Sequence, residues 1–288
     1  MRPVAIVTDS THYLTRELVE QAGINEVSLY VRSGERQERE SDITDYGAFY
    51  TGLAEVSELP STSQPSIGDF MSCYEPLLAA GRDVVSIHLS AGVSGTHDAA
   101  AAAKAMHDER GGEGQIAVVD SRTAAGGLGC VVLCAAAVAN AGGSLEDVVT
   151  RADEASDAMR LWFCVDTLEY LQRGGRLGRA QAWIGGALQI KPILSIESEV
   201  TAIERVRTSG RAFERMVEYM RTLHGDGADG WVVQHIQAEE KAMALVERGR
   251  ELFGSEPIWI SEVGPVIGTY TGPGLIGVGG LPARLLGA

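Results

Sequence analysis

The chain has 288 residues, of which 45% are apolar and 22% charged, with a formal net charge of −15. These values are typical of a folded protein, because a disordered chain would carry fewer apolar residues. At roughly 150 residues per domain, the length predicts about two domains, each with its own core. The acidic excess argues against non-specific binding to nucleic acid or to an anionic membrane surface.

No apolar run approaches the roughly 18 residues of a membrane span, and no secretory signal is recognisable at the N-terminus. Four cysteines are too few for a disulfide scaffold at this length. Cys130 and Cys134 have no histidine nearby, so a metal site is not predicted. We therefore expect buried thiols in a cytoplasmic protein that does not span a membrane.

The first half of the chain alternates short apolar runs with amphipathic stretches. The apolar runs predict strands over residues 3–7, 27–31, 83–89 and 116–119. Helical spacing, with stop and cap signals such as Gly23 and Ser66, predicts helices over residues 14–22, 66–80, 95–107, 126–141 and 144–158. Strands and helices in this succession predict right-handed crossovers and a parallel sheet covered on both faces, an α/β/α domain.

The second half has a different rhythm. Strands are predicted over residues 161–165, 190–196, 200–207, 231–236 and 258–263, and helices over 212–223 and 239–253. This pattern favours an α+β domain with a mixed sheet. We therefore expect an α/β protein with an N-terminal domain over residues 1–160 and a C-terminal domain over residues 161–288.

The segment over residues 84–99 reads VVSIHLSAGVSGTHDA, a buried strand that ends in a Ser/Gly turn and opens into a helix. Gly92 and Gly95 permit close approach of the backbone, and Ser94 or Thr96 can cap the first helical turn. Free N–H groups and the positive end of the helix dipole favour an anion there, such as a carboxylate or phosphate. A capped junction without a ligand explains the pattern equally well.

Two other polar segments have the same pair of interpretations. Residues 60–66, PSTSQPS, gather four hydroxyls around two prolines, which is typical of a turn before a helix as well as of a ligand contact. Asp9 follows the first strand, at the edge where α/β sheets place ligand sites. Capping the next helical turn is the simpler use of this carboxylate.

Sequence motifs of nucleotide and hydrolytic enzymes are missing or out of context. Residues 272–277 match the dinucleotide pattern GxGxxG, but too few residues follow them for the rest of that motif. The sequence contains no Gly-Lys-Ser/Thr loop, no GxSxG elbow and no HExxH pair. A self-contained nucleotide enzyme, hydrolase or zinc enzyme is therefore poorly supported.

Basic residues concentrate in one region of this acidic chain. Residues 173–221 hold nine basic and five acidic residues, a net charge of +4, which leaves −19 for the remainder. A solvated face is the usual explanation of such a charge run. The alternative is that these arginines face a phosphate or an acidic protein, for which guanidinium geometry is well suited.

Taken together, eight short motifs resemble those of the DegV family of bacterial fatty-acid-binding proteins. They occur in the family's order and span nearly the whole chain: TDST (8–11), TSQPS (62–66), LSAGVSGT (89–96), DS (120–121), LEYLQRGGRLG (168–178), KPIL (191–194), RVRT (205–208) and GPVIGTYTGPG (264–274). The resemblance implies one long-chain fatty acid in a tunnel between two domains, and no other cofactor. It also implies a binding subunit without catalysis of its own, whose fatty acid a separate ATP-dependent kinase phosphorylates for phospholipid synthesis.

Carried over motif by motif, the resemblance implies that Thr62 and Ser94 contact the fatty-acid carboxylate, with Ser63 and the Gly95 N–H as neighbours. A carboxylate at this helix start would gain the dipole and charge-assisted hydrogen bonds worth about 1.5–3 kcal/mol each. The acyl chain would contribute more, at roughly 0.8 kcal/mol per buried methylene. The head group would thus set orientation and the tail affinity.

Three further positions follow from the resemblance. Arg207 resembles an arginine linked to phosphoryl transfer with the kinase, and Arg173 is a second candidate for contact with that partner. Tyr270 stands where many members have histidine and joins the expected carboxylate contacts. A tyrosine donates a hydrogen bond, but its pKa near 10 prevents it from carrying positive charge at neutral pH.

Two alternatives to a fatty-acid carrier stay open at this point. One is an acyl or phosphoryl transferase that uses Asp9, Ser94 and Arg207, polar residues at strand ends. The other is a carrier of a different lipid acid, a phospholipid or an isoprenoid acid, in which Tyr270 marks altered recognition of the head group.

Overall fold

The computed structural model describes residues 2–56, 58–183 and 190–287. Its N-terminal half contains a four-stranded sheet of order β2-β1-β6-β7, in which neighbouring strands are parallel. The strands are β1 (Val4–Asp9), β2 (Ile24–Val27), β6 (Asp83–His88) and β7 (Ile116–Asp120). Side chains are buried along the whole of β1 because helices cover both faces of the sheet.

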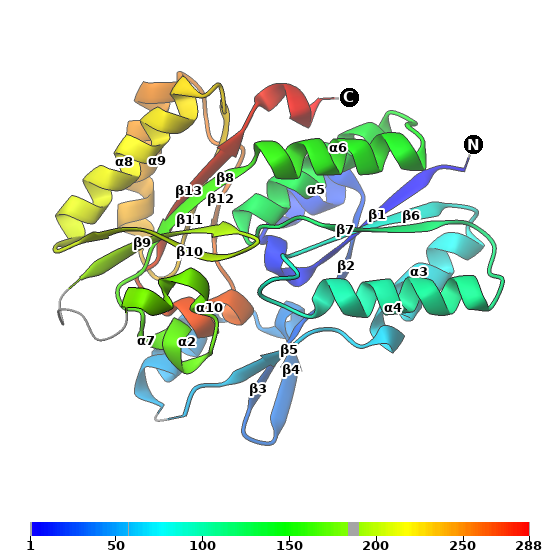
Figure 1. Ribbon diagram of the computed structural model, residues 1–288, viewed down its shortest axis with the longest axis horizontal. Helices are drawn as coiled ribbons and strands as arrows, with labels where there is room; N and C mark the ends of the chain where they lie inside the picture. The colour runs from blue at the N-terminus through cyan, green and yellow to red at the C-terminus, as the bar shows by residue number, and fades with distance from the viewer. Residues whose placement is uncertain (1, 57, 184–189, 288) are drawn as a thin grey trace.

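These helices form two layers around the parallel sheet (Figure 1). One layer contains α1 (Arg16–Ala22), α5 (Gly126–Asn140) and α6 (Leu145–Ala158), and the other contains α3 (Ile67–Ala79) and α4 (Thr96–Glu109). Capping boxes at Ser66 and Ser144 fix the starts of α3 and α6, as their sequences predict. The predicted α/β/α arrangement is confirmed.

The C-terminal half is built on a six-stranded mixed sheet of order β10-β9-β8-β13-β11-β12. Its strands are antiparallel to their neighbours except β11 and β12, which are parallel. They are β8 (Arg160–Cys164), β9 (Lys191–Glu197), β10 (Glu199–Val206), β11 (Gly230–His235), β12 (Ile260–Glu262) and β13 (Ile276–Leu281). The predicted mixed sheet is confirmed.

Helices α8 (Ser209–Gly225) and α9 (Glu239–Phe253) cover the outer face of this second sheet. Helix α5 packs against β1 of the first sheet and also against β8, β11 and β13 of the second, so it lies between the two sheets. This position explains why α5 is apolar almost all round: ten of its residues are buried, among them Cys130 and Cys134. Cys164 is buried as well, whereas Cys73 is half-buried.

A small third sheet departs from the sequence prediction. Residues 27–31, predicted as one strand, divide between β2, which ends at Val27, and β3 (Tyr30–Ser33). The prediction is wrong because the chain leaves the parallel sheet at Ser28 within one apolar run. β3 pairs with β4 (Arg36–Arg39) and β5 (Ser61–Ser63), and the β3–β4 hairpin extends away from the rest of the molecule (Figure 1).

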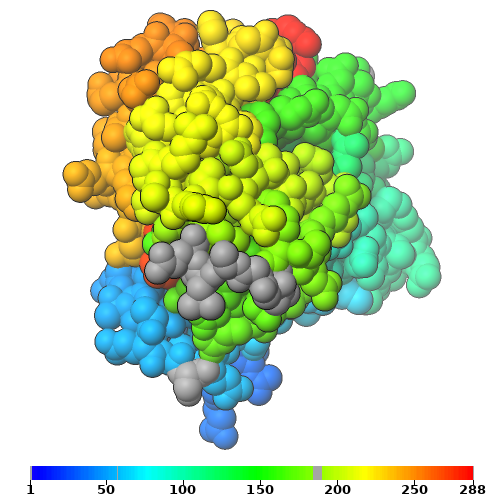
Figure 2. Space-filling model, turned by 60° about the vertical axis from the view of Figure 1, so that its left-hand side comes forward, coloured from blue at the N-terminus to red at the C-terminus, as the bar shows by residue number. Residues whose placement is uncertain are grey.

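Three helices without a clear sequence signal complete the inner side of the second sheet: α2 (Tyr46–Glu55), α7 (Glu169–Arg173) and α10 (Pro265–Thr271). Helix α10 packs against α2, α7, β3 and β5, so residues from both ends of the chain share one core. Figure 2 shows the light-blue surface of α2 below the yellow surface of α8 on one side of the molecule. The chain passes from one large sheet to the other at Arg160, and the division into domains there stays a prediction.

Candidate functional site

A cavity lies between the two large sheets, beside α5 and α10. It encloses about 960 Å³ of space free of protein atoms, open solvent at its mouth included. Its walls are mainly apolar and come from distant parts of the chain: Leu29, Leu89, Val93, Ala124, Ala125, Leu161, Phe163, Leu171, Ile196, Val200, Val263, Val266, Ile267, Leu275 and Gly277. Such a lining suits a long apolar ligand.

The polar lining residues include a connected cluster, which we call the mouth cluster: Thr62, Gln64, Ser94, Gly95, Arg176 and Tyr270. Gln64 and Arg176 are exposed, and the other four are half-buried. The cluster therefore joins the apolar interior of the cavity to solvent. Of the five residues predicted to contact a carboxylate, the structure brings Thr62, Ser94, Gly95 and Tyr270 to this cavity.

Thr62 and Tyr270 meet although 208 positions separate them. Their hydroxyl oxygens lie 2.6 Å apart, within hydrogen-bond distance. Thr62 projects from the short strand β5, which pairs with β3, and Tyr270 from the last turn of α10. Ser63 is the next residue on β5 and is not among the described residues that line the cavity, because successive strand side chains point to opposite faces.

Tyr270 is fixed by close packing against the Gly-Gly turn after α7. A Cβ atom at Gly174 would lie 2.2 Å from the Tyr270 ring, so only glycine permits this approach. The guanidinium of Arg176 lies 4.8 Å from the centre of the same ring. This arrangement places a positive charge over the face of the Tyr270 ring.

Ser94 and Gly95 lie in the turn between β6 and α4. Gly92, earlier in this turn, must be glycine because a Cβ atom would lie 2.1 Å from the Ser198 carbonyl oxygen of the C-terminal sheet. The Ser90 hydroxyl donates to the same carbonyl, at 2.5 Å. The turn is thus held against the second sheet, as the glycine pattern predicts.

The first turn of α4 faces the cavity mouth with Ser94 and Gly95. The Ser94 hydroxyl accepts a hydrogen bond from the Thr96 N–H at 3.3 Å, and Gly95, at the N-cap, has no side chain to cap the turn. The Gln64 side chain packs on Gly95, 3.1 Å from where its Cβ would lie, and so connects β5 to this turn. The positive end of the helix dipole is available to an anion.

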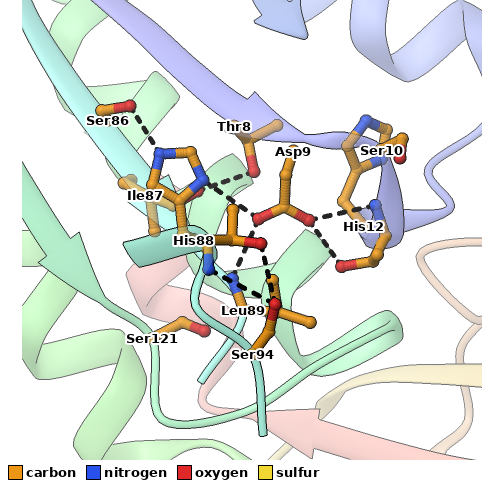
Figure 3. Close-up of polar contacts among 12 residues, drawn as sticks. Thr8, Asp9, Ser10, His12, Ser86, Ile87, His88, Leu89, Ser94 and Ser121 are labelled. Carbon is orange, nitrogen blue, oxygen red and sulfur yellow. Dashed lines mark hydrogen bonds and ion pairs between the residues drawn. The ribbon is translucent and has the colours of Figure 1, made fainter. Parts of the chain in front are cut away.

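Asp9 serves a different purpose (Figure 3). Its carboxylate is fully buried and accepts hydrogen bonds from the Thr11 N–H and hydroxyl and from the Leu89 N–H. The ring of His88 lies 3.0 Å from the other side of the carboxylate, and the Tyr74 hydroxyl reaches His88 through Ser86. We call these five partners and Asp9 the Asp9 network.

The Asp9 network joins the ends of β1 and β6. Burial by itself would raise the pKa of Asp9, but the hydrogen bond and charge of His88, together with Thr11 and Leu89, lower that pKa below its usual value. Asp9 also caps the short 3-10 turn η1 (Ser10–His12), the simpler use that its sequence suggests. It does not line the cavity.

Glu40 is a buried acid that sequence reasoning missed. Its carboxylate accepts hydrogen bonds from the hydroxyls of Ser10 (2.5 Å) and Tyr13 (2.8 Å) and from the N–H of Val266 (2.8 Å). Burial raises the pKa of Glu40 to about 7, against the effect of these hydrogen bonds. Glu40 thereby anchors the start of α10, the helix that carries Tyr270.

The remaining predicted residues lie apart from the mouth cluster. Arg207 is exposed just after β10, and Arg173 is exposed on α7, where it pairs with Glu169 at 3.5 Å. Asp9, Ser94 and Arg207 therefore do not converge on one site. Arg176 and Gln64 join the mouth cluster without having been predicted; Arg176 follows the Gly-Gly pair of LEYLQRGGRLG, which is the one local signal for it.

The described residues limit two other classes of site. Within residues 2–56, 58–183 and 190–287, no three histidine, cysteine or acidic side chains come together as metal ligands. Among the helices formed by the same residues, none has the length and apolar character needed to cross a bilayer.

Comparisons with known proteins agree with this architecture. A DegV domain-containing protein of Streptomyces coelicolor is 40% identical over 280 residues, which cover 96% of this chain and 98% of that protein. The crystal structure of Bacillus subtilis DegV, called a fatty acid binding protein, matches with a TM-score of 0.86 at 36% identity over 98% of this chain and 100% of that one.

A DegV family protein from Thermus thermophilus, described for its fatty acid binding, matches with a TM-score of 0.85 at 32% identity. The match covers 98% of this chain and 99% of that one. Residues 3–283 also match the family model described as an uncharacterised protein of the DegV family. The predicted resemblance is confirmed, and the chain belongs to the DegV family.

Proposed function

We propose that this protein binds one long-chain fatty acid in its cavity, with the carboxylate at the mouth cluster and the acyl chain against the apolar walls. The observation that carries the proposal is an apolar cavity with hydroxyls, a helix start and an arginine gathered at its open end. Fatty acid binding by the Bacillus subtilis and Thermus thermophilus relatives supports the same ligand class.

The two ends of the ligand would contribute differently. A carboxylate between Ser94, Tyr270 and the first turn of α4 would gain charge-assisted hydrogen bonds of about 1.5–3 kcal/mol each, before the cost of desolvation. Each methylene buried against residues such as Phe163 and Leu275 would add about 0.8 kcal/mol. A chain of twelve or more carbons therefore supplies most of the affinity.

We infer that the protein has no catalysis of its own. A transferase built on Asp9, Ser94 and Arg207 is disfavoured because Asp9 is occupied by its own network and Arg207 lies on the surface. A binding protein needs only the cavity and the mouth cluster. No cofactor other than the bound fatty acid belongs to this proposal.

The experiment that tests lipid binding is native mass spectrometry of the purified protein, followed by organic extraction and lipid analysis. We expect one fatty acid of about 14–18 carbons per chain, a range that the family resemblance implies. If a phospholipid or an isoprenoid acid is recovered instead, the protein is a carrier of that lipid and not of a fatty acid. A ligand-free protein that also fails to bind fatty acids in titration would contradict the proposal.

We also propose that the carboxylate is presented to a separate ATP-dependent kinase in the cytoplasm. The mouth cluster reaches solvent through Gln64 and Arg176, and the exposed Arg207 and Arg173 belong to the positively charged stretch over residues 173–221. Arginines on an otherwise acidic chain suit an acidic partner or a transferred phosphate.

Charge reversal separates this role from lipid binding. We expect Arg207→Glu to abolish ATP-dependent acyl phosphate formation with the kinase present, while fatty-acid affinity is unchanged. Arg16→Glu reverses the charge of an exposed residue on α1 and serves as the control. It should change neither acyl phosphate formation nor fatty-acid affinity. If Arg207→Glu still supports acyl phosphate formation, the basic stretch is only a solvated face and does not contact the kinase.

A further inference from the structure

One position on the cavity wall lacks a side chain where its neighbours have large ones. Gly277 on β13 pairs with Phe163 on β8 and with Gln234 on β11. Residues paired directly across a sheet point to the same face, and all three line the cavity. The wall therefore carries a gap one residue wide between Phe163 and Gln234.

The packing around Gly277 leaves room for a side chain. A Cβ atom built there would lie 3.4 Å from the Phe163 Cβ, an ordinary van der Waals contact. Two residues along the same face, a Cβ atom at Gly279 would lie 2.8 Å from the Met159 Cε and 3.0 Å from a Leu161 methyl group. Protein atoms fill the space beside Gly279, whereas the space beside Gly277 belongs to the cavity.

The backbone does not demand glycine at residue 277 either. Gly277 is not among the described residues with positive φ, and the pairing of β13 with β8 and with β11 continues through Gly277 without a bulge. Glycine inside a strand weakens the strand, and it often marks a bulge, a tight bend or a site where a ligand or another backbone approaches closely. Since no protein atom presses on this position, a ligand in the cavity is the remaining reason.

The walls beside the gap are fixed. The Gln234 side-chain oxygen accepts a hydrogen bond from the Gly126 N–H at 2.5 Å, and its nitrogen donates to the Ser261 hydroxyl at 3.0 Å. Phe163 is 6% exposed and belongs to the core around α7 and α10. A side chain at residue 277 would therefore project into the cavity rather than displace its neighbours.

We propose that Gly277 is a specificity-determining residue that sets the length of acyl chain that the cavity accepts. The inference rests on the proposed fatty-acid binding. Gly277 lies on the wall formed by the second large sheet, between Phe163 and Gln234. The mouth cluster instead comes from β5 and the residue after it, from α10 and from the turns beside α4 and α7. In the proposed pose Gly277 therefore faces the acyl chain rather than the carboxylate.

The test is a series, Gly277→Ala, Gly277→Val and Gly277→Leu, measured against saturated fatty acids of 10 to 18 carbons. Each methylene group of the acyl chain that the new side chain excludes from the cavity should weaken binding about fourfold. We expect Gly277→Leu to weaken the 18-carbon acid by about fiftyfold, with a small change for the 10-carbon acid. Gly277→Ala, which the packing accommodates, should change the dependence of affinity on chain length in the same direction but only slightly.

A matched control is Val278→Ile, the next residue on β13, whose side chain packs on the opposite face under α8 and α9. It should leave the length profile unchanged. Equal weakening of all chain lengths by the Gly277 variants, or an unchanged profile in folded variants, would overturn the inference. If the wild-type protein binds none of the acids, the proposed function itself fails.

Discussion

The Asp9 network and the mouth cluster are both polar, and both contain residues that follow strands of the molecule. In the Asp9 network the carboxylate is buried, and each of its oxygens has two partners within the protein. In the mouth cluster, Thr62 and Tyr270 are half-buried, bond to each other and face a cavity beside the exposed Arg176. The first cluster is saturated, whereas the second keeps capacity for a ligand.

This difference teaches how to separate structural from functional polar residues in a fold of this kind. A position at the carboxyl edge of a sheet is shared by both clusters and does not decide between them. What decides is whether the protein itself satisfies the polar atoms. Substitutions in the Asp9 network should therefore change stability, and those in the mouth cluster should change binding.

The largest effect is expected at Asp9. Asp9→Ala removes the acceptor of four contacts and leaves the buried His88 ring and Leu89 N–H without their hydrogen-bond partner, so we expect a loss of about 3–5 kcal/mol in the free energy of unfolding. Urea denaturation measures this loss. Asp153→Ala, at an exposed position on α6, should change stability by less than about 0.5 kcal/mol. If Asp9→Ala is as stable as wild type but binds lipid weakly, the Asp9 network has a role in binding, which contradicts its assignment as structural.

The next largest effect is the contribution of Glu40 to the pH dependence of the free energy of unfolding. The folded protein holds the Glu40 proton up to about pH 7, whereas the ordinary pKa is 4.5, so the folded state binds more protons between these values. The free energy of unfolding should then fall as pH rises through this window, by up to about 3 kcal/mol from this group.

Glu40→Gln should remove that slope, because the amide does not titrate. Denaturation at several pH values between 4.5 and 8 measures this slope. Glu38→Gln, at a partly exposed position paired with Arg36, is the control and should keep the wild-type slope. If Glu40→Gln and wild type have parallel profiles, Glu40 is not the buried acid that this account requires.

The smallest effect sharpens the assignment of the mouth cluster. Thr62→Ala and Tyr270→Phe should each weaken fatty-acid binding by about 1 kcal/mol, with little change in stability. Because the two hydroxyls are bonded to each other, the double variant should lose less than the sum of the single losses. Isothermal titration measures all three variants. Ser63→Ala, on the opposite face of β5, should bind like wild type; equal losses at Thr62 and Ser63 would contradict the assignment.

Much of the fold follows from local patterns. Strands β1 and β6 are mostly buried, β7 is a compact apolar run, and α3 and α6 carry capping boxes, so these elements are visible in the sequence. Helix α10 and strand β13 are not, because their glycines suit close approach of other segments rather than helix or strand propensity.

The site was visible only in part for a similar reason. Ser94 belongs to a strand-turn-helix pattern, and Thr62 to a hydroxyl-rich motif. Arg176 and Glu40 acquire their roles from tertiary contacts, with Tyr270 and with Val266, that no local spacing encodes. Glu40 lies in the charged stretch RQERESD, which resembles an exposed loop although Glu40 itself is 2% exposed.

The central claim is that a fatty-acid carboxylate lies at the mouth cluster. Carbon-13 NMR of hexadecanoic acid labelled at the carboxyl carbon, bound to the protein, tests it most directly. We predict one bound carboxyl resonance that moves in Tyr270→Phe and stays in place in Ser63→Ala. A bound resonance at the same position in all three proteins would contradict the claim, because the carboxylate would then lie elsewhere.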